Sequence, residues 1–131
     1  MELWRGAPYE YSRSAVGLVF CAGACPLDTV GNVVGPGDFE AQARQAVENL
    51  LSALHEAGAD AEGLLKTTIY VATNERADLV RVWEVVAARL GRAPSTLLGV
   101  SLLGYPDQLV EIEAVAAASV RAERAAAARR A

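Results

Sequence analysis

The stretch QLVEIEAVAAA (108–118) alternates as a β-strand with one buried face does. One side of this strand carries only apolar residues, namely Val110, Ile112 and Ala114. The other side carries two carboxylates, Glu111 and Glu113, because residues at i and i+2 of a strand point to the same face. These acids are either the solvated face of a sheet or the acid–base groups of a site.

Two helices are predicted upstream of this strand. Asp38 is a good N-cap and Gly58 a good stop for the first, whose apolar residues recur at steps of three and four: Phe39, Ala43, Val47, Leu50, Leu51 and Leu54. The second is expected from Asn74 to Gly91, and its apolar stripe consists of Leu79, Val80, Trp83, Val86, Ala87 and Leu90.

Four further strands complete the expected order β-β-α-β-α-β-β. Residues 17–25 and a short return strand at 33–34 are expected to form a hairpin, and 95–103 is expected to be another strand. The strand at 63–73 should place four residues on one face: Leu65, Thr67, Ile69 and Val71.

This order predicts an α+β fold, a mixed β-sheet with two helices on one face. The helices can cover only that face. The other face, which we expect to include Leu97, Leu109 and Val115, is too apolar to be left in water, and self-association is the simplest cover.

Length and composition limit the class of protein. With 131 residues, the chain is expected to be a single domain over 1–118, followed by a frayed or disordered tail over 119–131. No apolar run approaches the roughly 18–20 residues that cross a membrane, and the N-terminus lacks a signal pattern, so we expect a cytoplasmic protein without a membrane partner. The net charge of −4 argues against a nucleic-acid partner.

The two cysteines do not predict a disulfide or a metal site. In an extended segment, Cys21 and Cys25 would lie roughly 13 Å apart, which is too far for a disulfide. No third ligand lies near them in the sequence, so we interpret both as small buried thiols. The single histidine, His55, falls on the polar face of the first helix, and no catalytic role is assigned to it.

Three separated motifs carry a family resemblance: CPLDTVGNVVGPGDFEAQARQAVENL (25–50), KTTIYV (66–71) and VEIEAVA (110–116). With them, residues 8–118 resemble the Rid family, the reactive-intermediate deaminases that are also called the YjgF family. The resemblance implies a chorismate-mutase-like fold and a homotrimer whose sheets form a central barrel. It also implies small-molecule clefts between subunits, where an arginine and a glutamate hydrolyse enamines and imines to 2-keto acids and ammonia.

The resemblance assigns part of such a site to this chain. Glu111 matches the catalytic glutamate, Tyr9 the tyrosine of the N-terminal PY, and Gly23 the glycine of the cleft strand. In RAPST (92–96), Pro94 occupies the position of the arginine that would bind a substrate carboxylate.

Other polar positions of the family site also differ. Trp83 falls where an asparagine is expected, although it is more simply explained as core or cleft wall, and Ala22 and Ala24 replace a serine and a glutamine. Arg92 is the first alternative cation, but an arginine after a helix C-terminus is commonly solvated. Arg13 and Lys66 are further alternatives.

Three functions follow from this comparison. The first is a Rid-like hydrolase acting on an imine or enamine without the usual carboxylate, with Glu111 as the proton-transfer group. The second is a non-catalytic trimer that binds a metabolite or another protein, and the third is a structural or chaperone-like trimer. No cofactor and no metal is expected in any of them. Glu111 and Glu113 also remain open to a simpler role as acids at a subunit rim, paired with arginines of a neighbour.

Overall fold

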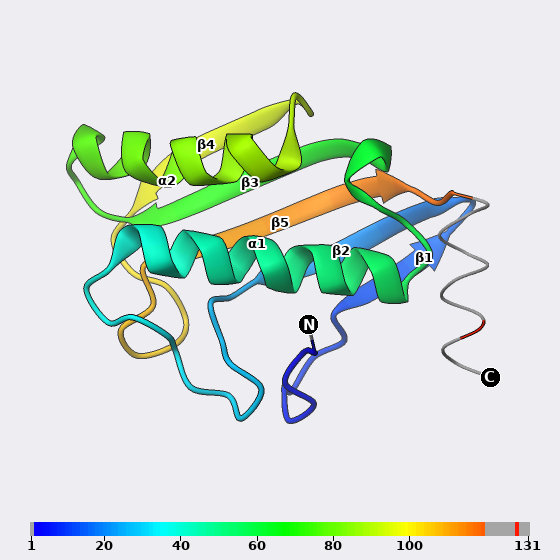
Figure 1. Ribbon diagram of the computed structural model, residues 1–131, viewed down its shortest axis with the longest axis horizontal. Helices are drawn as coiled ribbons and strands as arrows, with labels where there is room; N and C mark the ends of the chain where they lie inside the picture. The colour runs from blue at the N-terminus through cyan, green and yellow to red at the C-terminus, as the bar shows by residue number, and fades with distance from the viewer. Residues whose placement is uncertain (1, 120–127, 129–131) are drawn as a thin grey trace.

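A five-stranded mixed sheet carries two helices on one face, which confirms the predicted α+β fold class (Figure 1). The computed structural model describes residues 2–119 and 128, so most of the predicted tail at 119–131 lies outside the described residues. The elements in chain order are β1 (Ser12–Ala15), β2 (Leu18–Ala24), α1 (Phe39–Glu56), a short 3₁₀ turn (Ala61–Gly63), β3 (Leu64–Ala72), α2 (Arg76–Leu90), β4 (Ser95–Val100) and β5 (Val110–Ala117).

The last strand lies at the centre of the sheet, whose order is β1-β2-β5-β3-β4. β5 pairs antiparallel with both β2 and β3. β3 and β4 are parallel, and α2 is the crossover between them, as a parallel pair requires. The predicted alternation of β5 is confirmed, because Val110, Ile112 and Ala114 are buried under the helices and Glu111 and Glu113 lie on the opposite face.

The first helix agrees closely with its prediction. The Asp38 side chain accepts a hydrogen bond from the Ala41 N–H at 2.9 Å, and Gly58 follows the last turn with φ of +84°. The core face also includes two polar residues, Gln42 and Asn49. Both are buried and fully hydrogen-bonded, and they matter for the site described below.

The second helix differs from its prediction in register. It begins at Arg76 with Glu75 as N-cap, and it buries Val82, Val86 and Leu90 rather than Trp83, which is 37% exposed. Apolar residues surround most of this helix, so their spacing did not show which side faces the core. Packing against the sheet decides which side of α2 is buried.

Three strand assignments also need correction. The first hairpin joins β1 to β2 through Val16 and Gly17, whereas the expected return strand at 33–34 contributes a single bridge. Leu65 is exposed because a bulge between Leu64 and Lys66 turns it off the buried face. Leu97 pairs with Ile69 and therefore lies on the helix-covered face, not on the open one.

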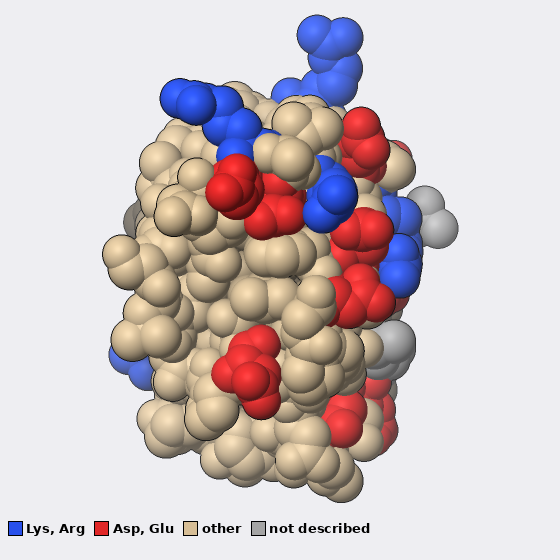
Figure 2. Space-filling view, turned by 90° about the vertical axis from the view of Figure 1, so that its left-hand side faces the viewer, with Lys and Arg blue, Asp and Glu red and all other residues tan. Residues whose placement is uncertain are grey.

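The open face of the sheet remains uncovered in the single chain. Phe20, which pairs with Val115, is 48% exposed there, and Leu98 lies beside Tyr70 on the same face. In the end-on view of Figure 2, many of the charged side chains lie on the side of the helices, but the open face also carries Lys66, Glu111 and Glu113. Of the three residues predicted for this face, only Val115 lies on it, because Leu97 and Leu109 pack against the core.

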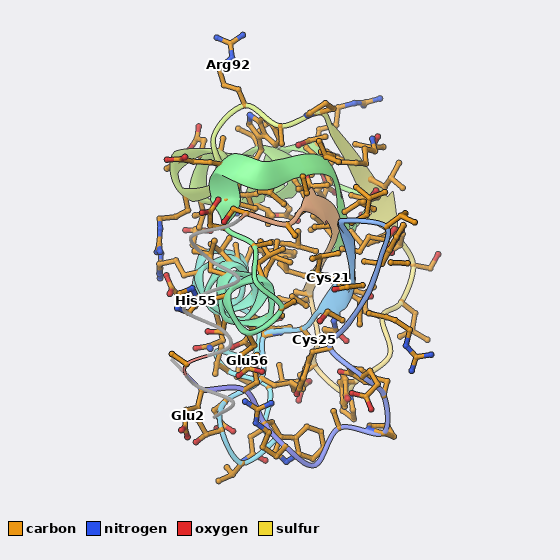
Figure 3. The ribbon with its side chains drawn as sticks, turned by 90° about the vertical axis from the view of Figure 1, so that its right-hand side faces the viewer. Glu2, Cys21, Cys25, His55, Glu56 and Arg92 are labelled. Atoms are coloured by element: carbon orange, nitrogen blue, oxygen red, sulfur yellow. The ribbon has the colours of Figure 1, made fainter. Side chains whose placement is uncertain are left out.

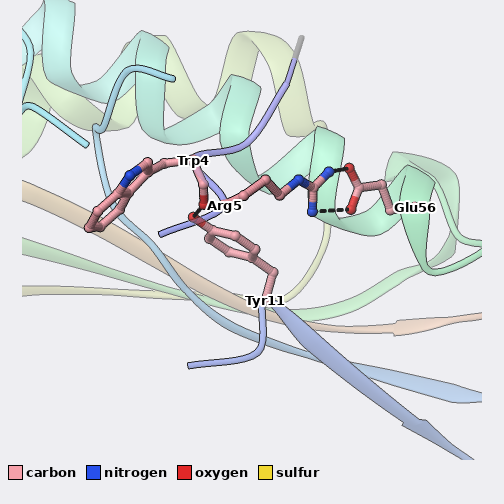
Figure 4. A network of polar contacts seen from close by, with 4 residues as sticks. All are labelled: Trp4, Arg5, Tyr11 and Glu56. Carbon is pink, nitrogen blue, oxygen red and sulfur yellow. Dashed lines mark hydrogen bonds and ion pairs between the residues drawn. The ribbon is translucent and has the colours of Figure 1, made fainter. Parts of the chain in front are cut away.

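The N-terminal segment is held against the end of α1. Arg5 forms a two-pronged ion pair with Glu56, and the Tyr11 hydroxyl donates to the backbone oxygen of Trp4 (Figure 4). The Trp4 indole lies so close to Gly31 that a Cβ on that glycine would come within 2.5 Å of the ring. This arrangement fixes the segment that carries Tyr9. Among the described residues, no helix is both long enough and apolar enough to span a membrane.

Candidate functional site

The Glu111 carboxylate lies at the centre of a polar cluster near the start of β5. Its Oε1 atom accepts hydrogen bonds from Gln108 Nε2 at 3.0 Å and from the Cys25 thiol at 3.4 Å. Among the described residues, both hydrogen-bond donors to this carboxylate therefore bind the same oxygen, Oε1. No buried side-chain oxygen in the described part of the chain lacks a partner, so the second oxygen, Oε2, reaches solvent.

Gly23 provides the space for that second oxygen. A β-bulge adds one residue to β2 between the pairs Cys21–Ala114 and Ala24–Ile112, and Gly23 lies in it. A Cβ at Gly23 would come within 2.1 Å of Glu111 Oε2. The carboxylate can occupy this position only because the residue beneath it has no side chain.

Two buried amides of α1 hold the segments that carry this cluster. Asn49 Nδ2 donates to the backbone oxygens of Cys25 and Leu27 at 2.8 and 2.9 Å. Gln42, two turns earlier on the same helix face, accepts from Leu109 N at 2.7 Å and donates to Asp107 O at 2.9 Å. The helix thus positions both the end of β2 and the loop before β5.

Two tyrosines extend the cluster. The hydroxyls of Tyr9 and Tyr105 are 3.2 Å apart, and the Tyr9 ring meets the Tyr11 ring edge-on with centroids 5.7 Å apart. Tyr105 belongs to the loop 101–109, whose Gln108 contacts Glu111. Residues from the N-terminus, the end of β2 and the last loop therefore meet at one place.

The neighbours of Glu111 in this cluster are neutral hydrogen-bond donors. Burial and the nearby Glu111 carboxylate raise the pKa of the Cys25 thiol to about 12, so it stays protonated and donates at neutral pH. Burial and the hydrogen bond with Tyr105 likewise raise the pKa of Tyr9. The three ion pairs among residues 2–119 lie elsewhere: Arg5–Glu56, Arg81–Asp78 and Arg89–Glu48.

The structure brings together only some of the residues assigned from sequence. Tyr9, Gly23 and Glu111 belong to one cluster or border it. Pro94 precedes β4, where its oxygen accepts from Thr67 N at 2.9 Å. Leu98 and Glu111 both pair with Tyr70, so they lie opposite each other two strand spacings apart. Pro94 lies four residues before Leu98 in the chain, which puts it roughly 16 Å from Glu111.

The remaining two assigned residues are also distant within one chain. Arg92 points away from the body of the protein, far from Cys25 (Figure 3). Trp83 lies on α2, on the opposite side of the sheet from the Glu111 carboxylate. A site that includes these residues with Glu111 requires a second copy of the chain.

Sequence reasoning missed three members of the cluster. Cys25 was interpreted only as an inert thiol, and Gln108 and Tyr105 received no role. A glutamine directly before an apolar strand was the available signal for Gln108. Glu113 differs from Glu111, because it accepts from the Tyr70 hydroxyl at 2.6 Å and borders a separate small hollow of about 220 Å³ on the open face.

The fold and this cluster define an α+β protein with a carboxylate-centred polar site beside an open sheet face. Residues 5–118 match the family described as Endoribonuclease L-PSP. A RutC family protein of Pyrococcus horikoshii is 32% identical over 110 residues, which cover 83% of this chain and 86% of the relative.

Solved structures agree with this match. A Mycobacterium tuberculosis member of the YjgF/YER057c/UK114 family has a TM-score of 0.71 at 32% identity, covering 86% of this chain and 88% of that one. YyfA of Yersinia pestis, a member of the Rid family, has a TM-score of 0.76 at 27% identity, covering 84% and 87%. The chain belongs to the Rid family, also called the YjgF family, as its motifs indicated.

Proposed function

We propose that this protein is a homotrimeric hydrolase of an imine, an enamine or a related reactive intermediate that is not a standard 2-imino acid. The observation that carries the proposal is the Glu111 carboxylate, with one oxygen held by Gln108 and Cys25 and the other free above Gly23. A carboxylate fixed in this way can take a proton from water and return it.

The uncovered sheet face supports the self-association in this proposal, and the family resemblance suggests that the assembly is a trimer. Phe20 and its neighbours expose apolar surface that a second copy would cover, and closed rotational symmetry is the usual form of such association. The family resemblance implies that the clefts lie between subunits. In that arrangement, Pro94, Arg92 and Trp83 of one subunit would approach Glu111 of its neighbour.

The chemistry needs one water molecule and no added electron carrier. Glu111 Oε2 takes a proton from water as the water oxygen bonds to the imine carbon, and it then gives this proton to the imine nitrogen, which yields a carbinolamine and the free carboxylate. A solvent proton then converts the amino group to the ammonium form, and the C–N bond breaks to release ammonia as the carbinolamine hydroxyl loses its proton to the carboxylate, which returns it to solvent. The net reaction converts R₂C=NH and H₂O to R₂C=O and NH₃.

Pro94 argues for an uncharged substrate. A proline offers neither a charge nor a donor to a substrate carboxylate, unlike the arginine fork that the family resemblance puts at this position. The loss of a charge-assisted bidentate contact typically lowers the rate by roughly a hundredfold or more. The Tyr9 and Tyr105 hydroxyls can instead bind a neutral polar group.

The test compares an imino acid with its uncharged carboxamide, each generated in solution by an amine or amino-acid oxidase, with ammonia release as the readout. We expect faster hydrolysis of the neutral imine and little effect on the imino acid. Glu111→Gln should lower the rate by about 10²–10⁴, because it keeps the shape of the side chain but removes the base. Glu113→Gln is the matched control on the same strand face, and it should change the rate by less than a few fold.

The alternative is a trimer that binds a metabolite without turning it over, or a chaperone-like trimer. Failure of the wild-type protein to accelerate any imine or enamine would favour these alternatives and refute the hydrolase. Equal losses from Glu111→Gln and Glu113→Gln, together with a weaker trimer, would show that both acids belong to a charged interface instead.

A further inference from the structure

We propose that Gln108 is a positioning residue that selects which oxygen of Glu111 handles the proton and couples that carboxylate to the loop carrying Tyr105. This inference rests on the proposed function for Glu111. Gln108 is 4% exposed, and its position in the fold is at the join between the loop 101–109 and β5.

All hydrogen-bonding groups of the Gln108 amide are used, and they fix its orientation. Its Oε1 accepts from the backbone N–H of Tyr105 at 3.0 Å. Its Nε2 donates to the backbone oxygen of Val110 at 3.1 Å and to Glu111 Oε1 at 3.0 Å. If the amide were reversed, its NH2 group would face the Tyr105 N–H, which is also a donor. Its oxygen would face the Val110 oxygen and Glu111 Oε1, which are both acceptors, so only one orientation satisfies every partner.

The consequence for Glu111 is an asymmetry between its two oxygens. Oε1 is engaged by the Gln108 amide and the Cys25 thiol, whereas Oε2 lies over Gly23 and reaches solvent. Donors that bind a carboxylate favour its charged form, and they strengthen in a partly buried setting. Gln108 therefore holds Oε1 in place and leaves Oε2 facing water.

The same amide links substrate contact to proton transfer. Tyr105 contributes the hydroxyl that lies beside Tyr9, and its backbone N–H is bound to Gln108. A shift of the 101–109 loop changes both the tyrosine pair and the hydrogen bond on Glu111. No second residue of the described chain bonds to both the Tyr105 backbone and the Glu111 carboxylate.

Gln42 provides a matched control for this role. It is also a buried glutamine and also fastens the 101–109 loop, through Asp107 O and Leu109 N. It makes no hydrogen bond to Glu111. A merely structural contribution to the loop should therefore be shared by both glutamines, whereas an effect on the carboxylate should belong to Gln108 alone.

The experiment follows the titration of the Glu111 carboxylate by NMR of protein labelled with ¹³C at glutamate side chains, with Glu111→Gln used to assign the signal. In Gln108→Met, the midpoint should differ from that of wild type, because the hydrogen bond from the Gln108 amide to Oε1 is lost. Gln108→Glu keeps the shape of the side chain and serves as a second variant in case Gln108→Met fails to fold. In it, two carboxyl groups face each other and should titrate in two coupled steps, one of them above the wild-type midpoint. Gln42→Met should leave the midpoint in place.

The other titratable groups near this carboxylate are the same in every variant: Cys25 from the end of β2, Tyr9 from the N-terminal segment, Tyr105 from the 101–109 loop, Tyr70 from β3 and Glu113 two residues along β5. An unchanged Glu111 midpoint in both Gln108 variants, or an equal shift in Gln42→Met, would overturn the proposal. The readout needs no substrate, so it is separate from the proposed function. A midpoint that moves in protein that hydrolyses no imine would support the role of Gln108 in orienting Glu111 and refute the hydrolase.

If the protein is a hydrolase, the pH–rate profile adds a second readout. The acid limb for the neutral imine should move in Gln108→Met in the same direction and by the same amount as the NMR midpoint. A uniform drop in rate with an unmoved acid limb would contradict the proposal, because it would indicate only general damage to the loop.

Discussion

Adding one methyl group at Gly23 should displace the Glu111 carboxylate while leaving the fold intact. In Gly23→Ala the new Cβ would lie 2.1 Å from Glu111 Oε2 and 2.6 Å from its Cδ, well inside the 3.0 Å limit that real Cβ contacts respect. The clash is with the end of a flexible side chain and not with backbone. The carboxylate can therefore move aside at little cost to stability.

The required movement decides the expected effect. Oε2 must retreat by roughly 1 Å, and because Oε1 moves with the same rigid carboxylate, the hydrogen bonds to Oε1 from Gln108 (3.0 Å) and Cys25 (3.4 Å) are lost or distorted. A misplacement of about 1 Å can lower a rate by about a hundredfold. We expect this loss for the neutral imine, with a melting temperature within a few degrees of wild type.

The assay combines ammonia release, thermal unfolding and a crystal structure of the variant. Gly63→Ala is the control, because its Cβ would come within 2.5 Å of the backbone oxygen of Ala117, which cannot swing away. That variant should lose stability without moving Glu111. Full activity in Gly23→Ala, or an unmoved carboxylate in its crystal structure, would refute the argument that Gly23 is there to admit Glu111.

Three further predictions concern stability and assembly. Val16 is 95% exposed and holds φ of +48° in the β1–β2 turn, a conformation that asparagine tolerates better than valine. Val16→Asn should therefore raise the free energy of unfolding in urea by about 1 kcal/mol. The control Val30→Asn, at a position that is 69% exposed and has no positive φ, should give no such gain. Burial raises the pKa of Cys21 to about 11 and that of Cys25 to about 12, so the unfolded chain releases these protons first as pH rises above about 9. Stability should then fall by up to about 1.4 kcal/mol per pH unit for each thiol, and replacing both cysteines by alanine should flatten this slope; an unchanged slope would show that other groups control it. Phe20→Glu should dissociate the proposed trimer in light scattering, and a variant that remains trimeric would exclude this face as the interface.

Strong periodicity explains which elements were predictable. α1 has a capping aspartate, a clear apolar stripe and a terminal glycine, and β5 alternates strictly, so local physics agrees with the tertiary structure in both. α2 is apolar on most sides, and β1 is a short polar edge strand, so neither carries a pattern that identifies its buried face.

Part of the site was predictable for a different reason. Glu111, Gly23 and Tyr9 stand out as an acid in an apolar strand, a glycine within a strand and a tyrosine after proline in a family motif. Gln108, Cys25 and Tyr105 carry no comparable mark, because their role depends on a β-bulge and on a loop that folds back over the sheet. Cys25 and Tyr105 make long-range contacts, with Glu111 86 residues away and with Tyr9 96 residues away. Gln108 contacts Tyr105 and Glu111 only three residues away, but the turn that brings them together is set by the fold of the loop.

The sequence was enough for the layer arrangement and for the side of the sheet on which the two glutamates lie, since both follow from the periods of strands and helices. Tertiary structure alone separated the two acids. Glu111 meets Gln108, Cys25 and Gly23, whereas Glu113 meets Tyr70. The reason is that a strand period assigns a face but not a partner, and partners come from whichever distant segments the bulge, the loop and the buried amides of α1 bring to that face.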